Sequence, residues 1–122
     1  MPELDYAGYV MAFAARSAIA RAWSAFQERY PLVLGPVVTM QPFPVGFDVA
    51  SEENFATLIR NFRMTVLANL LGLPAAVVPV GVTGGLPQGV QIIGARYRED
   101  LCLDAAEAIE DRLGVVTPID PR

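Results

Sequence analysis

The side chains that most often carry out covalent catalysis are scarce in this sequence of 122 residues. It contains three serines (Ser17, Ser24 and Ser51), one cysteine (Cys102) and neither lysine nor histidine. A serine or cysteine nucleophile needs a neighbouring base to take its proton, and histidine or lysine usually serves as that base. Two of the serines fall inside a long predicted helix, and Ser51 is placed to cap another helix. The residues themselves therefore predict no complete nucleophilic site.

Cys102 and the acidic residues around it raise the question of a thiol or metal site. Cys102 falls at helical spacing with Ile109 and Leu113, so we interpret it as a buried structural thiol rather than a nucleophile. The same helix carries a cluster of acidic side chains, namely Glu99, Asp100, Asp104, Glu107, Glu110 and Asp111. Pairs four residues apart could hold a hard metal ion, but a solvated face balanced by arginines is more common. We expect no metal and no other cofactor.

Three amide side chains, Asn69, Gln88 and Gln91, lie in a stretch over residues 64–95 that carries no charge. A buried amide needs hydrogen-bond partners, so we expect these side chains to bridge backbone segments. The alternative is that they orient a substrate amide. The glycines of this stretch do not have the spacing of a dinucleotide-binding or phosphate-binding loop, which leaves them as turn residues.

Composition limits the partners that the chain can have. It is 53% hydrophobic and 18% charged, with a formal net charge of −4. The acidic balance and the lack of a basic stripe argue against nucleic acid as a partner. Glycines and prolines divide the uncharged stretch into pieces too short to cross a membrane as a helix. The acidic N-terminus lacks the pattern of an export signal, and a single cysteine excludes an internal disulfide, so we expect a cytoplasmic protein.

The elements that must position these residues follow from the apolar periodicity and the Gly and Pro positions. We expect helices over residues 5–29, 52–71 and 99–113 and strands over residues 32–38, 75–80 and 89–94. The short connection between the last two strands predicts an antiparallel hairpin, in which Pro79 requires an edge, a strand end or a bulge. We therefore expect an α/β fold with a partial mixed sheet of about three strands flanked by three helices, in a single domain over residues 1–122.

The strands read as continuous apolar runs, which is typical of a sheet covered on both faces. Three helices leave part of such a sheet for another surface to cover, so we predict self-association or a place within a larger fold. An irregular loop over residues 39–47 contains two prolines and a glycine, yet it is apolar. Such a loop after a strand often lines a pocket in α/β proteins.

Two motifs in the uncharged stretch resemble a known family. N-L-L-G-L-P-A at residues 69–75, followed by V-P-V-G at residues 78–81, resembles a late motif of the amidase signature family. G-L-P-Q-G-V-Q-I-I-G at residues 85–94 resembles the family's G-L-P-x-G-x-Q-x-x-G stretch. The upstream helix, strand and proline-rich loop occur in the matching order. The resemblance thus covers nearly the whole chain, corresponds to the C-terminal third of such enzymes, and is greatest to indoleacetamide hydrolase-like amidases.

The resemblance implies hydrolysis of a carboxamide to an acid and ammonia by a serine nucleophile. In the family that serine is activated through a second, cis-peptide serine and a lysine, with oxyanion donors in a Gly/Ser-rich segment of the N-terminal half. This sequence has no lysine and no G-G-S-S-G-G segment. We therefore expect no catalytic residue here and no activity of the chain alone. The loop would supply part of the acyl-side pocket wall and suit an aromatic substrate, through Met40, Gln41, Phe43 and Phe47.

Three functions are compatible with the sequence. The first is the C-terminal portion of an amidase-signature hydrolase, as a truncated gene product, an expressed fragment or one part of a split enzyme. Its partner is then the missing N-terminal half, and a small amide binds only in the completed enzyme. The second is a noncatalytic module that forms homo-oligomers or binds a partner through surface that once packed on that half. The third is a relative of the amidase-like subunit of the tRNA-dependent amidotransferase, which works with partner subunits.

Overall fold

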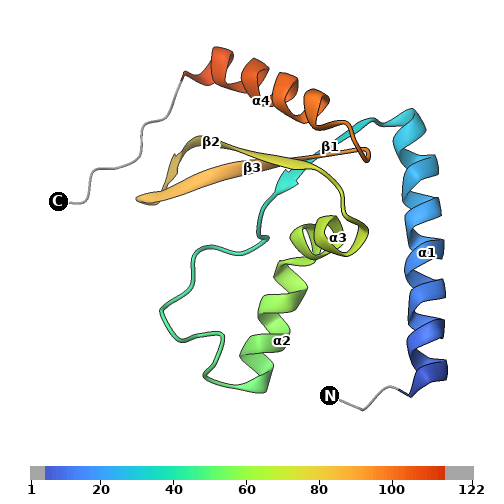
Figure 1. Cartoon of the computed structure of the whole chain (residues 1–122). Coiled ribbons are helices and arrows are strands. Elements are labelled where there is room, and N and C mark those ends of the chain that lie inside the picture. The colour runs from blue at the N-terminus through green and yellow to red at the C-terminus, as the bar shows by residue number, and fades with distance from the viewer. Residues whose placement is uncertain (1–4, 115–122) are drawn as a thin grey trace. The chain divides into compact units, whose positions relative to one another are not determined.

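A computed structural model describes residues 5–114, which divide into two compact units on either side of the Pro31–Leu32 bond (Figure 1). The first unit is the helix α1 (Tyr6–Arg29). The Asp5 carboxylate caps it by accepting a hydrogen bond from the Gly8 amide at 2.7 Å. The helix ends before Pro31, as the restriction on a residue that precedes proline predicts. That residues 1–122 form a single domain stays a prediction.

The second unit is built on a three-stranded antiparallel sheet with the order β1-β3-β2 (Figure 1). Its strands are β1 (Leu32–Pro36), β2 (Ala75–Thr83) and β3 (Leu86–Gly94). The predicted hairpin is confirmed, because Gly84 and Gly85 join β2 to β3 with φ angles of 60° and 79°. A two-residue type I′ turn requires positive φ at both positions, which glycine adopts without strain.

The α/β class and the three strands are confirmed. The sheet is not mixed, as predicted, but antiparallel throughout, because both of its strand pairs are antiparallel. The reason is the strand order. Strands β1 and β2 run in the same direction, yet β3 separates them, so they form no parallel pair. Pro79 lies on the edge strand β2, where the register shifts between Pro79 and Gly81. Both features accommodate a residue that cannot donate a backbone hydrogen bond.

Three helices complete the second unit, namely α2 (Glu52–Asn61), α3 (Arg63–Leu71) and α4 (Glu99–Leu113). The predicted helix over residues 99–113 is confirmed. The single helix expected over residues 52–71 is wrong, because the chain turns at Phe62 between α2 and α3. The Asn61 carbonyl there accepts a hydrogen bond from the Thr39 amide at 3.1 Å. The loop after β1 is therefore hydrogen-bonded to a backbone carbonyl at the point where the helix is interrupted.

The core of the second unit is centred on β3. Ile92 and Ile93 point to opposite faces of the sheet, and both have no exposed surface. The central strand is therefore covered on both faces, with α4 packed over β2 and β3 on one of them (Figure 1). The edge strands are covered less well, since Leu34 and Val77 are each 57% exposed. None of the helices in the described range is long and apolar enough to cross a membrane.

Gly94 allows β3 to approach α4 closely. A Cβ atom at this position would lie 2.6 Å from Cys102 Sγ and 3.2 Å from the Arg98 carbonyl oxygen. We predict that Gly94→Ala lowers the free energy of unfolding by about 1–3 kcal/mol, the usual cost of overpacking. Urea denaturation followed by circular dichroism measures it. Gly89→Ala on the same strand is the control, because its nearest contacts at 3.4 Å leave room for a methyl group.

The steric origin of that loss can be tested with a second substitution. Cys102→Ala removes the sulfur atom that the new methyl group would strike. The double variant should therefore lose less stability than the sum of the two single variants. Strictly additive losses would show that the methyl group introduced by Gly94→Ala does not clash with Cys102.

Candidate functional site

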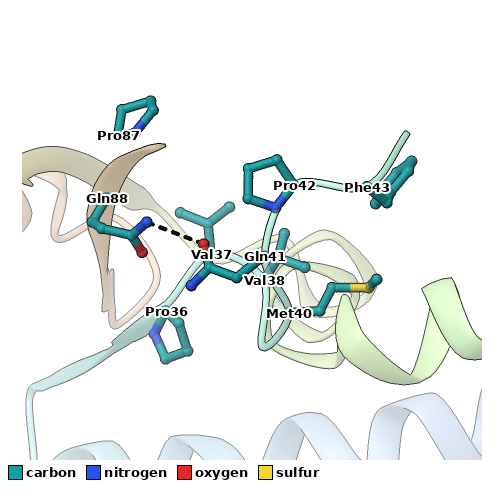
Figure 2. Close-up of a pocket in the computed structure, with 10 residues that line it drawn as sticks. Pro36, Val37, Val38, Met40, Gln41, Pro42, Phe43, Pro87 and Gln88 are labelled. Atoms are coloured by element: carbon teal, nitrogen blue, oxygen red, sulfur yellow. Dashed lines mark hydrogen bonds between the residues drawn. The ribbon is translucent and has the colours of Figure 1, made fainter. Parts of the chain in front are cut away.

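A cavity of about 200 Å³ lies between the loop after β1 and the first residues of β3 (Figure 2). Its wall consists of Pro36, Val37, Val38, Met40, Gln41, Pro42, Phe43, Pro87, Gln88 and Gly89. Three of the four residues expected to form a pocket wall, Met40, Gln41 and Phe43, line this cavity. The fourth, Phe47, does not line it but packs its ring against Phe43, with the ring centroids 5.4 Å apart. A role for these four residues in binding substrate stays a prediction.

Hydrogen bonds to the helices hold the loop in place. The Thr39 hydroxyl donates to Asn61 Oδ1 at 2.8 Å, and the Thr65 hydroxyl donates to the Val37 carbonyl at 2.8 Å. Asn61 Nδ2 in turn donates to the Thr57 carbonyl at 2.9 Å. This bond sets the orientation of the Asn61 amide, so that its oxygen faces Thr39. The loop is thus tied to both α2 and α3. One wall of the cavity is therefore formed before any ligand binds.

A pair of glutamines joins the loop to β3 across the cavity (Figure 2). Gln88 Nε2 donates to Gln41 Oε1 at 3.2 Å and to the Leu86 carbonyl at 3.2 Å. A carbonyl oxygen only accepts, so the Leu86 contact fixes the orientation of the Gln88 amide. Gln88 thereby bridges two chain segments, as predicted. Gln88 Oε1 and Gln41 Nε2 have no hydrogen-bond partner within residues 5–114.

The other two amides of the uncharged stretch do not line the cavity. Asn69 Nδ2 donates to the Thr65 carbonyl of its own helix at 2.9 Å. Gln91 is only 5% exposed, and its Oε1 has no partner among the described residues. Only Gln88 therefore reaches the candidate site. The sequence did not indicate this, because the contact joins residues 47 positions apart.

The candidate nucleophiles are not in the cavity wall. The Ser17 hydroxyl donates to the Phe13 carbonyl within α1, and Ser51 Oγ accepts the Asn54 amide as the predicted cap of α2. The Cys102 thiol is buried, donates to the Pro74 carbonyl at 3.8 Å, and has its pKa raised by that burial. A raised pKa keeps the thiol protonated, and a protonated thiol is a poor nucleophile. The expected burial of Cys102 is confirmed, and its role as a structural thiol rather than a nucleophile stays a prediction.

The acidic cluster on α4 does not form a metal site in the part of the chain that the structure describes. No three His, Cys, Asp or Glu side chains gather there closely enough to hold an ion. Asp100 instead pairs with Arg98 at 2.9 Å, and this hydrogen bond holds the pKa of Asp100 below its ordinary value. Both side chains of the pair are about half exposed, so the pair belongs to the solvated face of the helix.

Comparison with known proteins assigns the fold and its motifs to a family. A family model described as Amidase matches residues 2–103. The chain belongs to the amidase family. This amidase-family chain is 46% identical over 114 residues to the indoleacetamide hydrolase of Bradyrhizobium diazoefficiens. It is 33% identical over 95 residues to a glutamyl-tRNA(Gln) amidotransferase subunit of Lactobacillus gasseri. These matches cover 93% and 78% of the chain, but only 22% and 19% of the two relatives.

Solved structures of amidase-family proteins show the same arrangement of elements. The corresponding glutamyl-tRNA(Gln) amidotransferase subunit of Thermotoga maritima superimposes with a TM-score of 0.75 at 30% identity, over 87% of this chain and 23% of that protein. The 6-aminohexanoate cyclic dimer hydrolase complexed with substrate gives a TM-score of 0.75 at 26% identity, over 92% and 26%. The amidase-family chain thus has the fold of one segment of these proteins and spans about a quarter of their length.

Proposed function

We propose that this chain contributes the C-terminal portion of an amidase-signature hydrolase, including part of the wall that holds the acyl group. The supporting observation is an apolar cavity, held in shape by hydrogen bonds, whose wall contains no nucleophile. Its volume of about 200 Å³ is smaller than the roughly 300–1,000 Å³ of most ligand pockets. Another part of the completed enzyme supplies the rest of the pocket, the nucleophile and its base.

The proposed reaction is the hydrolysis of a carboxamide to a carboxylic acid and ammonia. The relative with 46% identity is an indoleacetamide hydrolase, which supports an aryl or indole acetamide as the substrate. The cavity wall suits such a substrate, because Met40 and Phe43 offer a thioether and a ring as apolar contacts for an aromatic acyl group.

A chimeric enzyme tests this proposal. The 114 matched residues of this chain replace the corresponding segment in the indoleacetamide hydrolase of Bradyrhizobium diazoefficiens. The chimera should convert indole-3-acetamide to indole-3-acetic acid, measured by liquid chromatography, because cores tolerate exchange when volume and patterning are kept. The host enzyme with the segment deleted is the control and should be inactive. A folded chimera without turnover would contradict the proposal.

A second candidate, a noncatalytic association module, is favoured by the apolar side chains exposed at the sheet edges. Leu34 and Val77 are each 57% exposed, which is unusual for strands that read as continuous apolar runs. In this case the partner is a second copy of the chain, and light scattering on the purified chain would show a stable homo-oligomer. In the first candidate the partner is the rest of the amidase, as in a split enzyme or an amidotransferase-type complex.

The net charge and the single cysteine support a cytoplasmic site of action and partners other than nucleic acid. The net charge of −4 gives no electrostatic attraction to a phosphate backbone. A single buried cysteine is suited to a reducing compartment. Fractionation of cells that produce the tagged chain measures its location.

A further inference from the structure

The interruption between α2 and α3 has no cause in the local sequence. Asn61, Phe62 and Arg63 include no proline or glycine, the residues that most often break a helix. Asn61 is the last residue of α2, so its carbonyl belongs to the helix end that lacks partners within the helix. This carbonyl instead accepts the Thr39 amide at 3.1 Å and the Thr39 hydroxyl at 3.3 Å. The interruption therefore supplies a hydrogen-bond acceptor to the loop after β1.

The side chain of Asn61 holds Thr39 as well. The Thr39 hydroxyl donates to Asn61 Oδ1 at 2.8 Å, while Asn61 Nδ2 is engaged by the Thr57 carbonyl within α2. Val38 and Met40, the residues on either side of Thr39, both line the cavity. The bonds to Thr39 therefore restrict the positions that these two wall residues can take.

We propose that Thr39 and Asn61 form a positioning pair, which holds the cavity wall at Val38 and Met40 in the shape that a bulky apolar acyl group requires. Neither member of the pair lines the cavity, so the pair acts through the two wall residues. A wall that is already ordered binds such a group more tightly, because binding does not have to restrict the loop. The role in an enzyme rests on the proposed function, whereas the position of the wall is a property of this chain.

The exposure of the pair separates this role from a general contribution to stability. Thr39 is exposed and Asn61 is half-buried, so water can take the place of the Thr39 hydroxyl at Asn61 Oδ1. A hydrogen bond that is exchanged for one to water contributes little to the free energy of unfolding. Loss of the hydroxyl should therefore change the loop rather than the stability of the whole unit.

Thr39→Val tests the pair in the 122-residue chain, because it keeps the shape of the side chain and removes the hydroxyl. Hydrogen exchange followed by nuclear magnetic resonance should show that the Thr39 amide exchanges about three- to tenfold faster, the usual effect of one hydrogen bond. The methyl signal of Met40 should shift in the same variant. Thr39→Ser keeps the hydroxyl, so its exchange rate should stay within about twofold of that of the original chain.

Thr83→Val is the matched control, because it makes the same change at the end of β2 in a residue outside the cavity wall. It should leave both the exchange of the Thr39 amide and the Met40 signal unchanged. An unchanged exchange rate at Thr39 in Thr39→Val would overturn the inference. An equal acceleration throughout the second unit would also overturn it, because that is the result of a loss of global stability.

The chimera with the indoleacetamide hydrolase extends the test to the reaction. In an active chimera, Thr39→Val should raise KM for indole-3-acetamide about three- to tenfold and change kcat by less than about twofold, because the altered wall weakens binding without changing the reactive groups. Thr39→Ser and Thr83→Val should keep the original KM. A fall in kcat at unchanged KM would contradict a positioning role of the pair.

The two measurements distinguish failure of this inference from failure of the proposed function. An inactive chimera would contradict the proposed function, while hydrogen exchange in the 122-residue chain would still decide whether the pair positions the wall. An active chimera whose KM does not respond to Thr39→Val would contradict the inference alone.

Discussion

The 122-residue chain by itself is expected to hydrolyse neither phenylacetamide nor indole-3-acetamide above the uncatalysed rate. Enzymes accelerate reactions by at least about 10⁶-fold, and a single oxyanion donor contributes about 10²–10³ of this. The chain has no lysine or histidine to act as a base. Its cavity wall contains no serine or cysteine, and the Cys102 thiol is buried with a raised pKa. The loss relative to a complete amidase should therefore amount to essentially the whole rate enhancement.

An assay for release of ammonia and of the carboxylic acid tests whether the chain hydrolyses these amides. The indoleacetamide hydrolase of Bradyrhizobium diazoefficiens serves as the positive control under the same conditions. A mock purification from host cells that do not produce the chain controls for contaminating host amidase. Turnover that is absent from the mock preparation and is blocked by a serine-directed phosphonate would show a nucleophile within these 122 residues. That result would contradict the assignment of the reactive groups to another part of the enzyme.

Features that depend on neighbouring residues could be predicted from the sequence. Two consecutive glycines, Gly84 and Gly85, predict the hairpin because few other residues adopt positive φ at both positions of a turn. Ser51 before two glutamates predicts the start of α2, and Gly72, with a φ of 64°, ends α3 as expected. Each of these signals acts over a few residues, and each is confirmed.

Features that depend on distant residues could not be predicted in the same way. The turn at Phe62 coincides with hydrogen bonds from Thr39 to Asn61, which is 22 positions away. The apolar stripe from residue 52 to 71 contains no sign of that contact. The place of Gln88 in the cavity depends on the pairing of β3 with both other strands, which sets where the loop after β1 meets β3. Local periodicity does not contain the order of strands in a sheet.

The expected cover of the sheet is found on the central strand but not on the edges. Ile92 and Ile93 are fully buried, whereas Leu34 on β1 and Val77 on β2 are each more than half exposed. An exposed apolar edge strand is a site at which another chain or segment can pair. The chain with these exposed edge side chains spans about a fifth of the relative with 46% identity.

Ile92→Ala is expected to be among the most destabilising substitutions in the chain. Ile92 has no exposed surface and lies between Leu34 and Ala76 of the flanking strands. Truncation of a buried isoleucine to alanine costs about 2–5 kcal/mol, because the lost contacts leave a cavity in the core. The whole free energy of unfolding of a domain of this size is about 5–15 kcal/mol. Urea denaturation followed by circular dichroism measures the loss.

Ile59→Ala is the matched control, because it removes the same atoms from a side chain on α2 that is 46% exposed. Its cost should stay below about 1 kcal/mol, as for most surface substitutions. Ile92 also follows Gln88 on the same strand, so unfolding of β3 would separate Gln88 from Gln41 and open the cavity. The Ile92→Ala chain should therefore unfold at a lower urea concentration than the Ile59→Ala chain. Equal stability of the two variants would show that β3 is not the centre of the core, and the fixed position of Gln88 would then lack its support.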